Sequence, residues 1–330
     1  MTNDKKCEMC GKVSKYYWGM NSGHTWCGNC YKKQKTLQEN IQEKEIINDN
    51  TQKILNRKQT TDMKCFVPNT NGYISRRICN TTDVKILEKA YNKKDFVLIV
   101  GETGTGKTHL IRHFCYKKKL PYARVNLNGG TTADELIGHF VPDETKSNGA
   151  IKWQDGILTT FVRNGGVIVL DEVNGCPADI LFCLHPITDD ERTLTLTDKD
   201  GEVVKAHPNF FLVATMNPDY EGTKPLNEAF KDRFKVKLNF DYNKKVEKQL
   251  IDNENILHLA DKLRIMKTKG EITTPISTRM LIYYVDNIKT YSNQIALEIF
   301  LNNFEQCERE PIKNVIELIT KGEDLTENEE

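Results

Sequence analysis

One octapeptide constrains this chain more than any other segment, because it combines three glycines with a lysine and a threonine. It matches G-x-x-x-x-G-K-[ST], follows an apolar run at residues 96–100 and opens a helical segment at residues 108–116. In that context glycines let backbone N–H groups surround phosphate oxygens at a helix N-terminus. The sequence therefore predicts a phosphate-binding loop formed by Gly101, Glu102, Thr103, Gly104, Thr105, Gly106, Lys107 and Thr108.

Two further apolar runs end in polar side chains. Residues 167–170 lead into Asp171 and Glu172, and residues 211–216 lead into Asn217. Open α/β sheets bind ligands at the carboxyl ends of their strands, where these side chains would stand. Acidic residues after a strand can also merely cap a helix, and an Asn-Pro pair can be a simple turn. The glycine-rich loop favours the functional interpretation for the two carboxylates.

Each of these residue types has a task in phosphate chemistry. We expect Lys107 to reach the β- and γ-phosphates, and Thr108 and Asp171 to hold Mg²⁺, the carboxylate through water. Glu172 would orient and deprotonate the attacking water. The sequence therefore predicts an enzyme that hydrolyses ATP with Mg²⁺ as its cofactor.

Apolar runs at residues 96–100, 123–127, 167–170 and 210–215 alternate with helical segments. This alternation predicts the α/β class, a mostly parallel sheet with helices on both faces, within a nucleotide-binding domain at residues 66–241. Longer helical stretches follow at residues 246–256, 257–266, 278–291 and 294–308, which indicates a helical lid subdomain at residues 242–321. A polar helical linker at residues 37–65 and an acidic tail at residues 322–330 complete the predicted organisation.

The first 36 residues are too few to bury a large core, and four of the ten cysteines stand there in two pairs. Their pattern, C-x₂-C-x₁₆-C-x₂-C, is typical of structural zinc sites with four thiolates. We therefore predict that Zn²⁺ is bound by Cys7, Cys10, Cys27 and Cys30. The other six cysteines have no such spacing and are expected to be reduced.

The charge of the chain restricts its partners. With 47 Lys and Arg against 46 Asp and Glu, the net charge is +1, so the chain as a whole has no electrostatic footprint for nucleic acid. Residues 1–36 hold seven lysines against Asp4 and Glu8, which allows nucleic acid contact there. A protein-docking module, or a merely solvated basic face, explains the same lysines.

The N-terminus does not resemble a secretory segment, and the apolar runs are too short to cross a bilayer. We therefore expect a soluble, cytoplasmic protein with no membrane partner. Amino-acid usage rich in Lys, Asn and Ile is typical of an AT-rich genome; if that genome is viral, the compartment is the host cell.

Taken in order, these segments resemble the AAA+ superfamily, in the dynein-related and MoxR-like branch. That branch includes midasin, the gas-vesicle and Rubisco-activating ATPases, and the CobS subunit of cobaltochelatase. The likeness covers about residues 73–284, and it is carried by the phosphate-binding loop and by residues 126–138, 155–158, 171–172, 206–210, 214–218, 229–234 and 277–279.

The resemblance implies roles for three more residues. Asn217 corresponds to the sensor-1 residue, which helps to position the water, Arg233 to the arginine finger, and Arg279 to sensor 2 on the lid. It also implies a homo-oligomer, a hexameric ring with ATP between subunits, that rearranges a bound macromolecule. Residues 140–155 and 193–204 resemble inserted hairpins, of which the first carries Trp153, a residue placed to touch substrate or to pack as a buried indole.

Partners and alternatives follow from the same resemblance. Many members work with a von Willebrand A domain, and this chain lacks the Asp-x-Ser-x-Ser motif, so such a partner would be a separate chain. Residues 1–36 resemble a GATA-type zinc finger, although residues 32–35 differ from the segment with which that family meets DNA. The leading hypothesis is a remodelling motor recruited through this finger. A CobS-like chelatase subunit, and a DNA-binding protein whose ATPase switches its assembly, are the alternatives.

Overall fold

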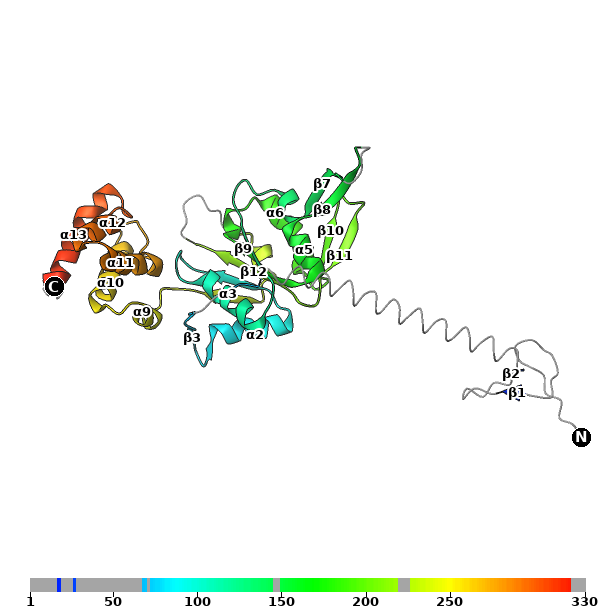
Figure 1. The fold of residues 1–330 in the computed structure, drawn as a ribbon, viewed down its shortest axis with the longest axis horizontal. Helices are drawn as coiled ribbons and strands as arrows, with labels where there is room; N and C mark the ends of the chain where they lie inside the picture. Colours follow the sequence, from blue (N-terminus) through cyan, green and yellow to red (C-terminus); the bar gives the residue numbers. More distant parts are fainter. Residues whose placement is uncertain are drawn as a thin grey trace, which may run out of the picture. The chain divides into compact units, whose positions relative to one another are not determined.

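The computed structural model describes residues 67–69, 72–144, 149–218 and 226–321, with the backbone of two short strands near the N-terminus (Figure 1). The chain divides into two compact units, Met1–Asp62 and Met63–Glu330. In the first unit, β1 (Tyr17–Trp18) pairs antiparallel with β2 (Trp26–Cys27). The predicted zinc-binding thiols, the linker and the acidic tail lie outside the residues whose side chains are described.

A five-stranded sheet forms the centre of the second unit. Its order is β13-β5-β12-β9-β6, and every neighbouring pair is parallel. The three inner strands are almost entirely buried and apolar, as a parallel sheet covered by helices requires. The predicted α/β class is confirmed, with strands β5 (Val97–Val100), β6 (Tyr122–Asn126), β9 (Gly166–Asp171), β12 (Phe210–Met216) and β13 (Val236–Asn239).

Helices bury their apolar faces against this sheet in one core. Phe114 and Phe161, on two different helices, are fully buried with Phe210 and Phe211 of β12. A short hairpin, β3 (Arg77–Ile78) with β4 (Thr81–Thr82), precedes the first of these helices. The helices are α2 (Asp83–Lys93), α3 (Lys107–Lys118), α4 (Ala133–Leu136), α5 (Ile157–Asn164), η2 (Val173–Gly175), α6 (Ala178–Cys183), α7 (His185–Thr188) and α8 (Glu228–Asp232).

Both expected hairpins are present, formed by β7 (Gly138–Pro142) with β8 (Ile151–Asp155) and by β10 (Thr193–Leu196) with β11 (Glu202–Lys205). Arg163 of α5 joins them, since its Nε donates to Asp155 at 2.8 Å and its NH1 lies 2.7 Å from Glu202 Oε1. Trp153 packs edge-on against Phe140 and donates to Asp155. Its indole is partly buried against the core, which favours the packing role.

The segment after residue 241 is helical, and its helices share a second core that includes Leu263, Leu281 and Phe300. The predicted helix at residues 246–256 is wrong, because Asn253 accepts a hydrogen bond from Ile256 N and starts a new helix. The predicted helix at residues 294–308 is likewise divided in two. The helices are α9 (Lys244–Leu250), α10 (Glu254–Thr268), α11 (Thr278–Thr290), α12 (Asn293–Leu301) and α13 (Gln306–Lys321). Within the described ranges, no helix is long and apolar enough to cross a bilayer.

Candidate functional site

The loop at residues 101–106 connects β5 to α3 and lies close to two other parts of the chain. A Cβ on Gly101 would stand 2.1 Å from the backbone oxygen of Phe240, after β13. Gly104 has a φ of 71°, and a Cβ there would lie 2.6 Å from Cβ of Ser277. Both positions therefore require glycine. Gly101 is needed for the close approach of another backbone, and Gly104 for a close approach and for its left-handed conformation.

Lys107 is the first residue of α3, and its side chain binds backbone oxygens at the start of the loop. Its Nζ donates to the carbonyl oxygens of Gly101 at 2.5 Å and Glu102 at 2.8 Å. Burial lowers the pKa of Lys107 to about 8, although the nearby carboxylates of Asp171 and Glu172 favour its charged form. An ammonium beside a helix N-terminus makes an anion-binding site.

Asp171 ends β9 and is 4% exposed. Strands on both sides supply its hydrogen-bond donors. Thr215 of β12 donates its hydroxyl to Oδ1, and Arg124 of β6 donates Nε to Oδ2 at 2.6 Å. Sequence reasoning missed both partners, because nothing in the local pattern shows which residues of neighbouring strands will face a given carboxylate.

Glu172 and Asn217 follow β9 and β12. Glu172 has a φ of 59°, a left-handed conformation that costs a non-glycine residue about 1–3 kcal/mol. The Asn217 backbone oxygen accepts a hydrogen bond from Asn174 Nδ2 at 2.7 Å, which holds the residue in place. Among the described atoms its buried Oδ1 has no hydrogen-bond partner, so it is free to bind a ligand or water.

A polar cavity of about 160 Å³ lies in front of the loop. Most of the predicted site residues outside the zinc module meet at its wall, namely Thr103, Gly104, Thr105, Gly106, Lys107, Thr108, Asp171, Glu172, Asn217 and Arg279. A second, more apolar cavity of about 330 Å³ adjoins it and shares His109 and Arg279 with it. Its wall includes Tyr73 and Ile282, so the two cavities together suit an anionic group joined to a less polar one.

Two groups of predicted residues lie away from the wall of the polar cavity. Gly101 and Glu102 form the base of the loop, where their carbonyls bind Lys107. Arg233 follows α8, donates NH1 to Ala229 O at 2.6 Å and has its Nε 2.8 Å from Asp189 Oδ1. The structure therefore does not bring Arg233 to the cavity of its own chain.

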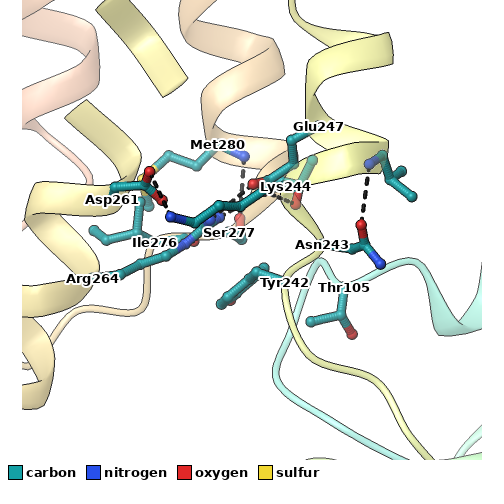
Figure 2. A network of polar contacts seen from close by, with 12 residues as sticks. Thr105, Tyr242, Asn243, Lys244, Glu247, Asp261, Arg264, Ile276, Ser277 and Met280 are labelled. Atoms are coloured by element: carbon teal, nitrogen blue, oxygen red, sulfur yellow. Dashed lines mark hydrogen bonds and ion pairs between the residues drawn. The ribbon is translucent and has the colours of Figure 1, made fainter. Parts of the chain in front are cut away.

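Arg279 reaches the cavity from the lid, where a buried ion pair supports the start of α11 (Figure 2). Arg264 donates NH1 and NH2 to Glu247, at 2.9 and 2.7 Å, and also contacts the Ile276 carbonyl. Burial opposes the charge of Glu247, which is 2% exposed, but hydrogen bonds from Arg264 and Thr278 hold its pKa below the usual range. Thr278, the residue before Arg279, is thus held by a hydrogen bond to this ion pair.

The lid also contacts the phosphate-binding loop directly. Arg264 stacks 4.1 Å from the ring centroid of Tyr242 (Figure 2), and the Tyr242 hydroxyl donates to Thr103 O at 3.0 Å. Lys267 Nζ lies 2.7 Å from Glu102 Oε1. These contacts attach the lid to the loop, and Arg264 of the buried ion pair takes part in them through Tyr242.

The polar cavity suits a hard divalent cation. Thr108 offers a hydroxyl and Asp171 a carboxylate, which are oxygen donors of the kind Mg²⁺ prefers when substrate phosphates complete its shell. In the part of the chain with described side chains, no group of three or more His, Cys, Asp or Glu could hold a metal. A magnesium site built on one carboxylate, one hydroxyl and the substrate is consistent with that finding.

Comparison with known proteins places this geometry in a family. Residues 96–234 match the model of the AAA domain of the dynein-related subfamily. The chain is 35% identical to the protein CbbQ of Hydrogenophilus thermoluteolus and 33% identical to NorQ of Paracoccus denitrificans, each across 61% of this chain and 77% or 76% of the relative. It is also 33% identical to an uncharacterised protein of Staphylococcus haemolyticus, across 75% of this chain and 98% of that protein.

The buried pair in the lid gives a testable prediction. Arg264→Met should lower the free energy of unfolding by about 3 kcal/mol or more, because it leaves the Glu247 carboxylate buried without its cation. It should also weaken nucleotide binding, since α11 and Arg279 lose their support. Urea unfolding and binding of a fluorescent ATP analogue measure the two effects.

Lys248→Met is the matched control, because Lys248 is an exposed cation on α9. This substitution should change stability by no more than about 0.5 kcal/mol. An Arg264→Met variant with the same free energy of unfolding as Lys248→Met would show that the ion pair does not stabilise the lid.

Proposed function

Because the chain belongs to the dynein-related subfamily of AAA ATPases, we propose that its ATP hydrolysis drives a ring of identical subunits that remodels a macromolecular partner. The ATPase activity, with ATP and Mg²⁺, follows from the family and from relatives such as CbbQ and NorQ. The observation that carries the proposal is the convergence of an ammonium, two carboxylates, an amide and a lid arginine on one polar cavity.

The residues around this cavity have different roles in the transfer of the γ-phosphoryl group to water. Lys107 and the first N–H groups of α3 bind the phosphate tail. Thr108 and Asp171 would hold Mg²⁺, which would supply positive charge to neutralise the phosphates. Glu172 accepts the proton of the attacking water, which the free Oδ1 of Asn217 helps to orient.

The adjoining cavity would receive the nucleoside, since it lies between the loop at residues 72–76, the first turn of α3 and the lid. Arg279 lines both cavities, and from there its charge would act on the phosphates of the same subunit. Closure of the lid would therefore depend on the nucleotide.

Two substitutions separate binding from chemistry. Lys107→Ala should lose ATP binding, because it removes the cation that pairs with the phosphates, whereas Glu172→Gln should keep binding and lose turnover. Equilibrium binding of ATP and steady-state phosphate release are the measurements. An equal loss of binding in both variants would refute these roles.

A ring explains why Arg233 lies away from the cavity of its own chain. At the end of α8 it would face the γ-phosphate held by a neighbouring subunit. Arg233→Ala should then retain ATP binding but lose roughly 10³-fold or more in rate, as removal of an arginine finger does.

Mixing variants tests whether Arg233 acts between subunits. Rings that contain both Arg233→Ala and Lys107→Ala subunits should recover some turnover, because some interfaces then combine an intact loop with an intact arginine. Mixed rings that demonstrably form and remain inactive would exclude the trans role.

The N-terminal module would recruit the partner and would depend on Zn²⁺. The support for this part of the proposal is the cysteine spacing alone. We expect metal analysis to find one zinc per chain, lost on substitution of Cys27 and Cys30 by serine without loss of ATPase activity. Cys183→Ser, which alters an exposed cysteine of the ATPase unit, should keep the zinc.

The nature of the partner separates the proposal from its alternatives. A remodelling motor should be stimulated by a protein partner, such as a separate von Willebrand A-domain chain. Stimulation by DNA would favour the DNA-binding alternative, and co-purification with a large chelatase subunit would favour the CobS-like one. Turnover measured with and without each addition distinguishes them.

A further inference from the structure

The Asp171 carboxylate, which the proposed function assigns to Mg²⁺, is already neutralised by a cation of the chain itself. Arg124 approaches Oδ2 with two guanidinium nitrogens, and its Nε lies 2.6 Å away. Thr215 donates to the other oxygen from β12, the neighbouring strand on the opposite side. A carboxylate that is 4% exposed needs such partners, because an uncompensated buried charge is costly.

Arg124 is not an ordinary structural partner of this carboxylate, because it is only half-buried. Its side chain is 47% exposed, whereas that of Asp171 is 6% exposed. It stands on β6, the edge strand of the sheet, and it lines the polar cavity with Lys107 and Thr108. The guanidinium can therefore leave toward the open side of the cavity without disturbing the core.

We propose that Arg124 is an exchangeable counter-ion that holds Asp171 while the site is empty and must leave it when a divalent cation binds. This inference rests on the proposed function. A guanidinium and a divalent cation beside the same carboxylate repel each other, also when a water lies between the carboxylate and the metal, so each weakens the binding of the other. Arg124 thus sets how much Mg²⁺ the loaded site requires and acts as a positioning residue rather than a catalytic one.

The test measures metal binding without turnover. Protein saturated with ADP is titrated with Mn²⁺, and the free ion is followed by electron paramagnetic resonance. Arg124→Met should lower the dissociation constant for Mn²⁺ about tenfold, because the metal no longer displaces a resident cation. Arg124→Lys, which keeps one cation without the paired N–H contacts, should fall between wild type and Arg124→Met.

Arg112→Met is the matched control, since it removes a partly buried cation from α3 that does not contact Asp171. It should bind Mn²⁺ as the wild type does. Circular dichroism confirms that each variant is folded, and if Arg124→Met is not, Arg124→Lys provides the comparison.

The outcomes separate this inference from the proposed function. Unchanged or weaker Mn²⁺ binding in Arg124→Met, or in Arg124→Lys where that variant provides the comparison, would overturn the exchange while leaving the ATPase assignment intact. Failure of the wild type to bind ADP with Mn²⁺ would instead count against the nucleotide site itself.

Discussion

The parallel register of β5, β12 and β9 is the constraint on which the site depends. Val100 pairs with Met216, and Leu170 pairs with Ala214, so the three strands end at the same edge of the sheet. The loop, the two carboxylates and Asn217 leave the sheet at that edge. A shift of one residue in any strand would turn its side chains to the other face, and Asp171 would no longer point into the cavity.

The second requirement is the lid, which contributes Arg279 to the polar cavity and one wall of the adjoining cavity. Its attachment to the loop uses few contacts, among them the pair of Lys267 with Glu102 and the hydrogen bond of Tyr242 to Thr103. These contacts are polar and partly exposed, so they are individually weak. Under the proposed function, a lid held in this way would respond to the nucleotide while its own apolar core stays intact.

Sequence reasoning was most successful where the chemistry is local. The strand before the loop, the loop itself and the carboxylates after β9 are each readable within about ten residues. It failed where a boundary depends on capping or on context. Asn253 divides the first lid helix by accepting a hydrogen bond from Ile256 N, and β13 was missed because its residues alternate polar and apolar as edge strands do.

The sequence by itself determined the fold class and predicted the position of the phosphate-binding loop, since both follow from short patterns of residue type. Only the tertiary structure decided which side chains oppose each other across strands and between the sheet and the lid. Arg124 and Thr215 stand 47 and 44 residues from Asp171, and Lys267 stands 165 residues from Glu102. Such pairs are selected by packing and register, which depend on the whole fold and leave no local pattern in the chain.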